Sequence, residues 1–174
     1  MDDLRYPLGR FERPSSLDPA LRALFTAQVA ETPAALRRAV VTLTDVQLDT
    51  PYRPDGWTVR QVVHHVPDSH LNAYVRFRLG LTEHHPTVKP YDEARWAELP
   101  DARTAPVEPS LLLLEAVHDR LVRLLRAMAP EDFARTVSHP DNGTMTLDHL
   151  LALYAWHGRH HVAQIQSLRK RLLW

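Results

Sequence analysis

Two histidines near the carboxyl end of the chain have the spacing of a chelating pair. His157 and His161 are four residues apart, so on an α-helix one imidazole stands a turn above the other and both can face one ion. The chain has 11 histidines among 174 residues, and chance alone can supply a pair at this spacing, so the pair by itself is weak evidence and its context must decide. His65 is the candidate for a third ligand, because it lies on the inward edge of another predicted helix.

Three imidazoles from two helices would suit a divalent metal ion. They carry no charge, so they leave the double charge of the ion uncompensated and at least one coordination position open, which is typical of catalytic rather than structural zinc sites. Asp68, one turn from His65, is a further ligand, an acceptor that orients an imidazole, or an exposed carboxylate. The histidines could instead be core side chains bonded to a neighbouring helix, and spacing alone leaves both interpretations open.

Other polar and aromatic side chains are weaker candidates for a substrate pocket. Each could equally be a surface or loop residue without a role. They are Arg76, Tyr91, Trp96 and His139. The histidines that flank the three ligand candidates are expected either at the surface or beside the ligands, and they are His64, His70 and His160; the pattern assigns no role to His84, His85 or His118.

The elements that must position these residues are amphipathic helices. Asp18 and Pro19 form a helix-start signal, and apolar periodicity predicts one helix over 18–43, bent at Pro33. Thr58 and Gln61 have the spacing of a capping box that starts a second helix with a continuous apolar face.

Two further helices are predicted in the second half of the chain. Ser110 is the expected cap of one that ends at Pro130, and Thr146 of one that runs almost to the carboxyl end. Between Glu83 and Pro109 the prolines exclude a long helix, so this segment is predicted to be a long crossover or lid with a short helix at 92–99. With no convincing strand, the pattern predicts an all-α four-helix bundle forming one domain over 1–174.

The composition excludes several classes of function. Lys plus Arg and Asp plus Glu are equal at 21 each, so no overall field favours a nucleic-acid or membrane partner. Cysteine is absent, which excludes disulfides, thiolate zinc sites and a cysteine nucleophile. Residues 1–10 have no apolar run like a signal peptide, and the longest apolar stretch, 150–156, is too short to cross a bilayer. We therefore expect a cytoplasmic protein.

Several short motifs, spread over nearly the whole chain, resemble the DinB-like superfamily of metal-binding bundles and, within it, the YfiT type. The most specific feature is a tryptophan eight residues before the first ligand histidine, combined with the distant pair spaced by four. The matching segments are Tyr6-Pro7-Leu8-Gly9, Pro51-Tyr52-Arg53, Gly56-Trp57-Thr58 through His65, Asp68-Ser69-His70, Pro90-Tyr91-Asp92-Glu93, His139-Pro140-Asp141, and Tyr154-Ala155-Trp156-His157 through His161.

The resemblance implies a fold, a ligand set and an assembly. It implies a bundle of up-down-down-up order, usually a homodimer, in which His65, His157 and His161 hold zinc or nickel. One departure is Pro67, where relatives typically have another residue, and it puts the local helix geometry in doubt rather than the ligands.

The resemblance also implies small-molecule chemistry, in one of two forms. One is a metal-dependent hydrolase that uses metal-activated water. The other is an S-transferase that joins a low-molecular-weight thiol, such as bacillithiol, to an electrophile; the absence of cysteine fits it, because the nucleophile would arrive with the substrate. A non-catalytic metal-binding stress protein is the third alternative, since a fold alone does not establish chemistry.

Overall fold

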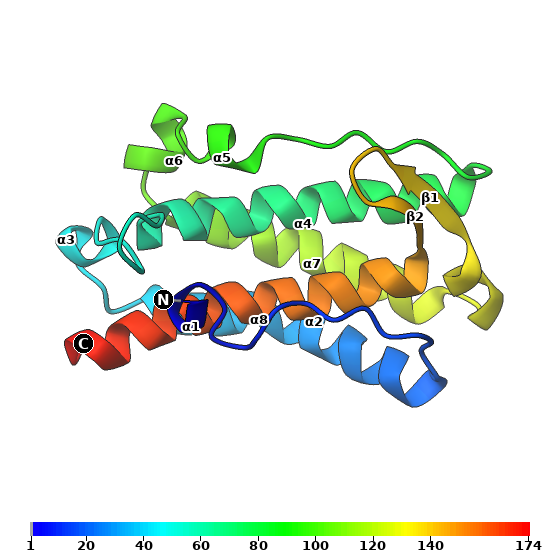
Figure 1. The fold of residues 1–174 in the computed structure, drawn as a ribbon, viewed down its shortest axis with the longest axis horizontal. Helices are drawn as coiled ribbons and strands as arrows, with labels where there is room; N and C mark the ends of the chain where they lie inside the picture. Colours follow the sequence, from blue (N-terminus) through cyan, green and yellow to red (C-terminus); the bar gives the residue numbers. More distant parts are fainter. Residues whose placement is uncertain (1) are drawn as a thin grey trace.

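Four long helices make up most of the chain in the computed structural model, which describes residues 2–174 (Figure 1). They are α2 (Pro19–Val40), α4 (Val59–Thr82), α7 (Glu108–Ala127) and α8 (Leu147–Leu172). The shorter elements are α1 (Asp2–Arg5), α3 (Asp45–Leu48), α5 (Glu93–Trp96), α6 (Pro100–Thr104), the 3-10 helix η1 (Pro130–Ala134) and the strands β1 (Thr136–His139) and β2 (Gly143–Thr146). No helix of the described part has both the length and the apolar character needed to cross a membrane.

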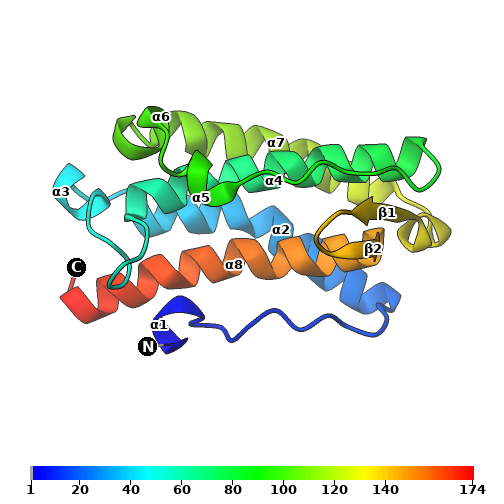
Figure 2. The same ribbon diagram turned by 45° about the horizontal axis from the view of Figure 1, so that its top comes forward.

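The helix directions confirm the predicted up-down-down-up order. In Figures 1 and 2, α2 and α8 run one way along the bundle and α4 and α7 run the other way. Helix α2 packs on α8 and α7, and α4 packs on α7 and α8. The bundle therefore contains two parallel neighbouring pairs, α2 with α8 and α4 with α7.

The parallel pair α4 and α7 forces the crossover between them. Parallel neighbours cannot be joined by a short turn, so residues 83–107 return along the length of α4 before α7 begins (Figure 2). Gln61 of α4 anchors this crossover by donating to the Ala97 carbonyl at 2.7 Å. The Val88 N–H donates to the Ser138 carbonyl of the β1 region at 2.9 Å. The crossover is thus held over one face of α4.

A group of buried histidines separates two apolar clusters that lie at opposite ends of the bundle. One apolar cluster, with Phe77 and Leu147, fills the end near the β-hairpin. A second, with Leu36 and Ile165, fills the opposite end. The chain segments between these clusters carry a buried set of imidazoles, namely His65, His70, His118 and His161. We call this set, together with the half-buried His157, the histidine layer.

The predicted helix starts are confirmed at three of four positions. Asp18 accepts from Leu21 N at 2.8 Å, Thr58 and Gln61 form the capping box, and Thr146 accepts from His149 N at 3.1 Å. The prediction for Ser110 is wrong: α7 begins at Glu108 with proline in its first turn, a position that suits the fixed φ of proline.

The expectation of no strand is also wrong. Strands β1 and β2 pair antiparallel, with Thr136 opposite Thr146 and His139 opposite Gly143. Each strand has four residues, too few for an alternating pattern to stand out from the sequence. Strand β1 meets the start of the crossover, where the Ser138 N–H donates to the Pro86 carbonyl at 2.9 Å.

Candidate metal centre

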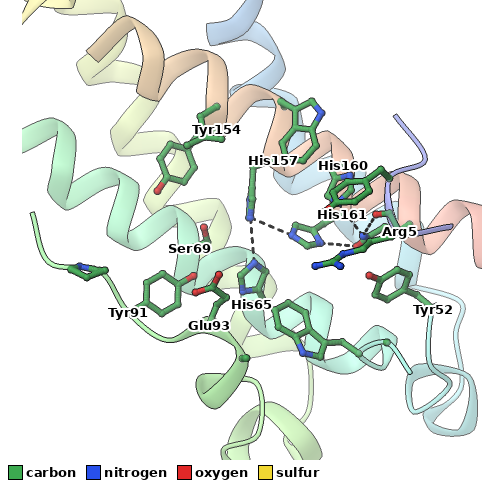
Figure 3. A pocket seen from close by; sticks show the side chains of 18 of the residues that line it. Arg5, Tyr52, His65, Ser69, Tyr91, Glu93, Tyr154, His157, His160 and His161 are labelled. Atoms are coloured by element: carbon green, nitrogen blue, oxygen red, sulfur yellow. Dashed lines mark hydrogen bonds between the residues drawn. The ribbon is translucent and has the colours of Figure 1, made fainter. Parts of the chain in front are cut away.

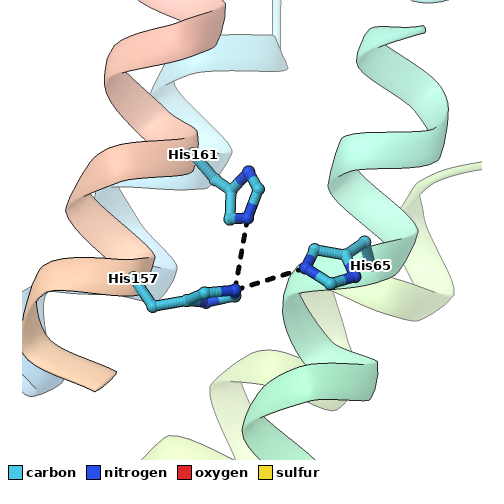
Figure 4. Close-up of side chains that lie close together, drawn as sticks. All are labelled: His65, His157 and His161. Carbon is cyan, nitrogen blue, oxygen red and sulfur yellow. Dashed lines mark hydrogen bonds between the residues drawn. The ribbon is translucent and has the colours of Figure 1, made fainter. Parts of the chain in front are cut away.

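Three imidazoles converge between α4 and α8, as the sequence predicted (Figure 4). His157 Nε2 lies 3.2 Å from His65 Nε2 and 3.2 Å from His161 Nε2. Within the described residues, these three are the one group of three or more His or carboxylate side chains whose ligating atoms gather, all within 4.8 Å of one another.

The nitrogen spacing fits a metal ion. Two imidazole nitrogens, each 2.0–2.1 Å from one zinc ion at a tetrahedral angle, lie about 3.3 Å apart. The two observed spacings of 3.2 Å match this geometry. The three side chains can therefore hold a divalent ion with little rearrangement.

A chain of hydrogen bonds sets the tautomer of His157. Pro33 has no N–H, so the Val29 carbonyl one turn earlier has no donor from the helix backbone. It accepts from His118 Nδ1 at 2.7 Å, which leaves His118 Nε2 to accept from His70 Nδ1 at 2.8 Å. His70 Nε2 then accepts from His157 Nδ1 at 3.1 Å. Because a carbonyl can only accept, every neutral ring in this chain has one allowed tautomer, and His157 Nε2 keeps its lone pair.

His161 is oriented by a shorter chain of the same kind. Gln164 donates through Nε2 to the Arg5 carbonyl at 2.8 Å, so its Oε1 faces His161 Nδ1 at 2.9 Å and accepts from it. His161 Nε2 therefore also keeps its lone pair. His157 and His161 present lone pairs to the same point, an arrangement that a cation stabilises.

Burial keeps the ligand candidates uncharged. Desolvation, followed by the effect of His160, lowers the pKa of His65 to about 4. Desolvation and the neighbouring imidazoles hold the pKa values of His157 and His161 well below the usual histidine range. All three rings are thus neutral near pH 7, the state that metal binding requires.

The three histidines lie at the wall of a cavity of about 700 Å³ (Figure 3). The amino-terminal segment contributes Arg5, the 52–57 loop Trp57, the crossover Tyr91 and Glu93, and the β-hairpin Asn142. A small molecule in this cavity would reach the point on which the imidazoles converge. The crossover that the parallel helices require therefore forms one side of the site.

The structure brings three of the four predicted pocket residues to this cavity. Arg76, Tyr91 and His139 line it. Trp96 does not: its ring packs against Tyr91 with centroids 4.6 Å apart and is 41% exposed. Trp96, the last residue of α5, packs on Tyr91 and is not part of the cavity lining.

Asp68 is not brought to the converging nitrogens. It is half-buried and belongs neither to the cavity lining nor to the group of ligating atoms. Desolvation, followed by Asp101, raises the pKa of its carboxyl to about 6. A direct metal-ligand role for Asp68 finds no support in this geometry.

The flanking histidines are buried rather than at the surface. His70 lies beside the ligands as part of the chain to His157, and His160 accepts from Gln164 at 3.0 Å. His64 faces away and hydrogen-bonds with Ser110 Oγ at 2.7 Å, which occupies the hydroxyl that was expected to cap α7. The prediction left open whether these three residues lie at the surface, and burial excludes it.

Sequence reasoning missed several residues of the site. His118 occupies the apolar stripe of α7, and a histidine in an apolar stripe must find a partner, so this signal was present. Gln164 follows His161 at a spacing of three, which places it on the same helix face. Glu93 and Ser69 had no such signal beyond their place in motifs of the resembling family, because only the crossover geometry brings Glu93 to the cavity.

The model of the DinB superfamily matches residues 28–165 of the chain. The chain belongs to the DinB superfamily. Two relatives named "Putative metal-dependent hydrolase", from Bacillus cereus (strain AH820) and Bacillus anthracis (strain CDC 684 / NRRL 3495), are each 52% identical over 174 residues, which is 100% of both chains.

A solved DinB-type structure shares the whole fold. YfiT from Bacillus subtilis, described as "a probable metal-dependent hydrolase with an unusual four-helix bundle topology", superposes with a TM-score of 0.96. It is 46% identical, and the match covers 99% of each chain. The DinB fold and its helix order are thus shared end to end with this protein.

Proposed function

We propose that this chain is a metal-dependent hydrolase of small molecules in which His65, His157 and His161 hold one divalent ion. The observation that carries the proposal is the convergence of three neutral imidazole nitrogens at the wall of an open cavity. Three protein ligands leave a coordination position for substrate or water. The names of the relatives, which describe metal-dependent hydrolases, support the same reaction class.

Zinc is the proposed ion, with nickel as the alternative. Imidazole nitrogen suits both metals, and the spacing near 3.2 Å fits a tetrahedral centre. When bound, such an ion supplies Lewis-acid chemistry, acidifying water and polarising the bond to be cleaved. In this proposal the three histidines hold the ion in place, and they transfer no proton in the reaction.

Glu93 is the proposed proton acceptor. Figure 3 shows its carboxylate between Tyr91 and His65, directed into the cavity. A carboxylate at this place can take the proton that the attacking water gives up and pass it to the leaving group. The hydroxyl of Ser69 interacts with those of Tyr91 and Tyr154, and this hydroxyl cluster can orient a polar group of the substrate.

The test separates metal binding from turnover. We expect one ion per wild-type chain, loss of tight binding in His161→Ala, and unchanged binding in the matched control His84→Ala, since His84 is exposed and outside the cavity. In Glu93→Gln the ion should remain, while hydrolysis of a panel of activated esters, amides and phosphoesters falls at least about 100-fold. Stoichiometric metal in His161→Ala would refute the ligand set.

Thiol transfer is the second candidate, and the cysteine-free chain favours it over any route through a protein thiol. Zinc-loaded protein would be incubated with a fluorogenic electrophile and several low-molecular-weight thiols, including bacillithiol. Acceleration that depends on both metal and thiol would assign an S-transferase, whereas turnover without thiol would assign a hydrolase. No turnover in either assay would indicate the non-catalytic alternative. The homodimer and the cytoplasmic location stay predictions.

A further inference from the structure

The cavity contains a buried cation with no carboxylate among its hydrogen-bond partners within the described residues. Arg76 is only 9% exposed and lines the cavity. Its guanidinium donates to Tyr154 Oη at 2.9 Å and to the Lys89 carbonyl at 3.4 Å, and its Nη2 lies 3.4 Å from His139 Nε2. All three groups are uncharged. Its Nε is buried without a partner. An arginine buried to this degree is normally paired with a carboxylate or other anion, and none of its contacts within the described residues is one.

His139, which lies beside the Arg76 guanidinium, is a second donor without an acceptor in the described part of the chain. His139 Nδ1 accepts from the Asp141 backbone N–H at 3.2 Å and lies 3.3 Å from Asn142 Nδ2. Burial, followed by the nearby Arg76 charge, lowers the pKa of His139, so the ring is neutral and its proton is on Nε2. That N–H then faces the Arg76 Nη2 donor at 3.4 Å. Two buried donors point toward one place where an acceptor is needed.

Acidic side chains at the cavity do not fill this place. Glu93 and Asp141 both line the cavity, but the Asp141 carboxylate is 73% exposed and 3.9 Å from the far nitrogen of His139, Nδ1. The Glu93 carboxylate is directed toward Tyr91 and His65 (Figure 3), and its charge has the smallest of the effects on the pKa of His139, after burial, Arg76 and Asp141. The part of the cavity wall formed by Arg76 and His139 therefore combines a fixed positive charge and two donors.

We propose that this DinB-superfamily protein binds substrates that carry a carboxylate, and that Arg76 and His139 hold this group. A carboxylate oxygen between the two donors would satisfy both and neutralise the guanidinium. The proposal rests on the proposed function for the position of the reacting bond, which would lie at His65, His157 and His161. The guanidinium of Arg76 contacts Tyr154 Oη at 2.9 Å, and the Tyr154 ring centroid lies 6.1 Å from that of His157. The carboxylate and the reacting bond thus belong to one small molecule that reaches from Arg76 to the three imidazoles.

The experiment compares two probes that differ only in charge at one end. N-acetylglycine and its amide, N-acetylglycinamide, would be titrated into the metal-loaded protein and followed by calorimetry and by the NMR signal of the Arg76 Nε–H group. We expect the carboxylate to bind at least about tenfold tighter than the amide and to shift the Arg76 signal. Equal affinities, or an unmoved Arg76 signal, would overturn the proposal even if every variant failed to fold.

Variants identify the group responsible. Arg76→Gln should bring the affinity ratio close to one, and Arg76→Lys should keep part of it. The matched control Arg78→Gln removes the same charge from the same helix, but Arg78 is exposed and bonded to Tyr74 outside the cavity, so the ratio should not change. A preference for carboxylate that survives in Arg76→Gln would place the anion elsewhere and overturn the assignment.

A last variant separates this site from the metal. His161→Ala removes a proposed ligand but leaves Arg76 and His139 in place, so the preference for carboxylate should persist there. Loss of the preference in His161→Ala, with the fold intact, would mean that the carboxylate binds the ion and would overturn the site at Arg76. Persistence of the preference without hydrolysis in any assay would leave the carboxylate site standing while the hydrolase proposal fails.

Discussion

His157 and His161 direct Nε2 toward the proposed ion because their Nδ1 atoms are engaged elsewhere. Both chains of hydrogen bonds end on a backbone carbonyl, at Val29 and at Arg5. The first carbonyl is free to accept because Pro33 interrupts the α2 ladder. A proline inside a long helix thus contributes to the orientation of an imidazole three hydrogen bonds away.

Replacing His118, in the middle of the hydrogen-bond chain to His157, should weaken metal binding without changing a proposed ligand. In His118→Phe the His70 tautomer is no longer imposed, so His157 can present an N–H to the ion; outer hydrogen-bond partners of ligands are typically worth 10- to 100-fold in affinity. We expect the Kd for zinc, measured by competition with a chromogenic chelator, to rise at least about tenfold. The ¹⁵N NMR signature of His157 should show a mixture of tautomers.

The matched control is His64→Phe, which removes a buried histidine that is not part of the hydrogen-bond chain to His157. It should alter stability by a similar amount but leave the Kd for zinc within about twofold. A folded His118→Phe protein with unchanged zinc affinity would contradict the ordering role of the chain, and an equal loss in both variants would reduce it to a general packing effect.

The parallel helices α2 and α8 approach each other closely beside the site. A Cβ at Gly158 would lie 2.5 Å from Thr32 Cγ2 and 2.7 Å from Thr32 Oγ1, well inside normal contact. Gly158 directly follows His157, so the distance between the two helices also sets the position of a proposed ligand. At the scale of elements, glycine is required here by close packing and not by an unusual φ.

Gly158→Ala should therefore lower the free energy of unfolding by about 1–3 kcal/mol, the usual cost of overpacking. Urea denaturation checks this value. Thr32→Ala removes both Thr32 atoms that would clash with the new Cβ. Adding Gly158→Ala to the Thr32→Ala variant should therefore lower the free energy of unfolding much less than Gly158→Ala does in the wild type. If the changes in the free energy of unfolding of the two single variants simply add in the double variant, the two helices do not meet at this point.

The histidine layer lies across the middle of the bundle between two apolar clusters, and it makes the whole molecule sensitive to acid. Burial lowers the pKa of His118 and of the nearby His160 to about 4, and it lowers the pKa of His64 as well. The unfolded chain has histidine pKa values near 6.5 and binds more protons between pH 6.5 and 4. The free energy of unfolding must then fall as the pH drops through this window.

The fall should be steep, because each such histidine contributes up to about 1.4 kcal/mol per pH unit. We expect the metal-free protein to lose at least about 3 kcal/mol between pH 7 and 5 in urea titrations. Asp68 acts in the opposite direction, since its folded pKa of about 6 lies above the ordinary value of 3.8, and it offsets a minor part of the loss of stability. His84→Ala, which removes an exposed histidine, should not change the slope; equal stability at pH 5 and pH 7 would contradict a neutral, buried layer.

Local signals in the sequence were enough to place most helices. Asp18, Thr58 and Thr146 cap them as predicted because a capping bond joins residues only three apart. The fourth start was missed because Pro109 and Ser110 offer competing signals, and the Ser110 hydroxyl is used by His64. The four-residue strands carry too short a pattern to be found.

In the site, too, local features could be predicted from the sequence, whereas contacts between distant residues could not. The pair His157 and His161 is a local feature of one helix, and its convergence with His65 followed from placing two apolar faces together. Only the tertiary structure decided that Glu93 and Arg76 share their cavity, that Trp96 does not, and that His118 bonds to His70. The two pairs lie 17 and 48 positions apart in the sequence, and the parallel packing of α4 and α7, with the crossover it imposes, brings them together. The sequence by itself determined the candidate ligands, and the packing decided which atoms of those ligands face the proposed ion.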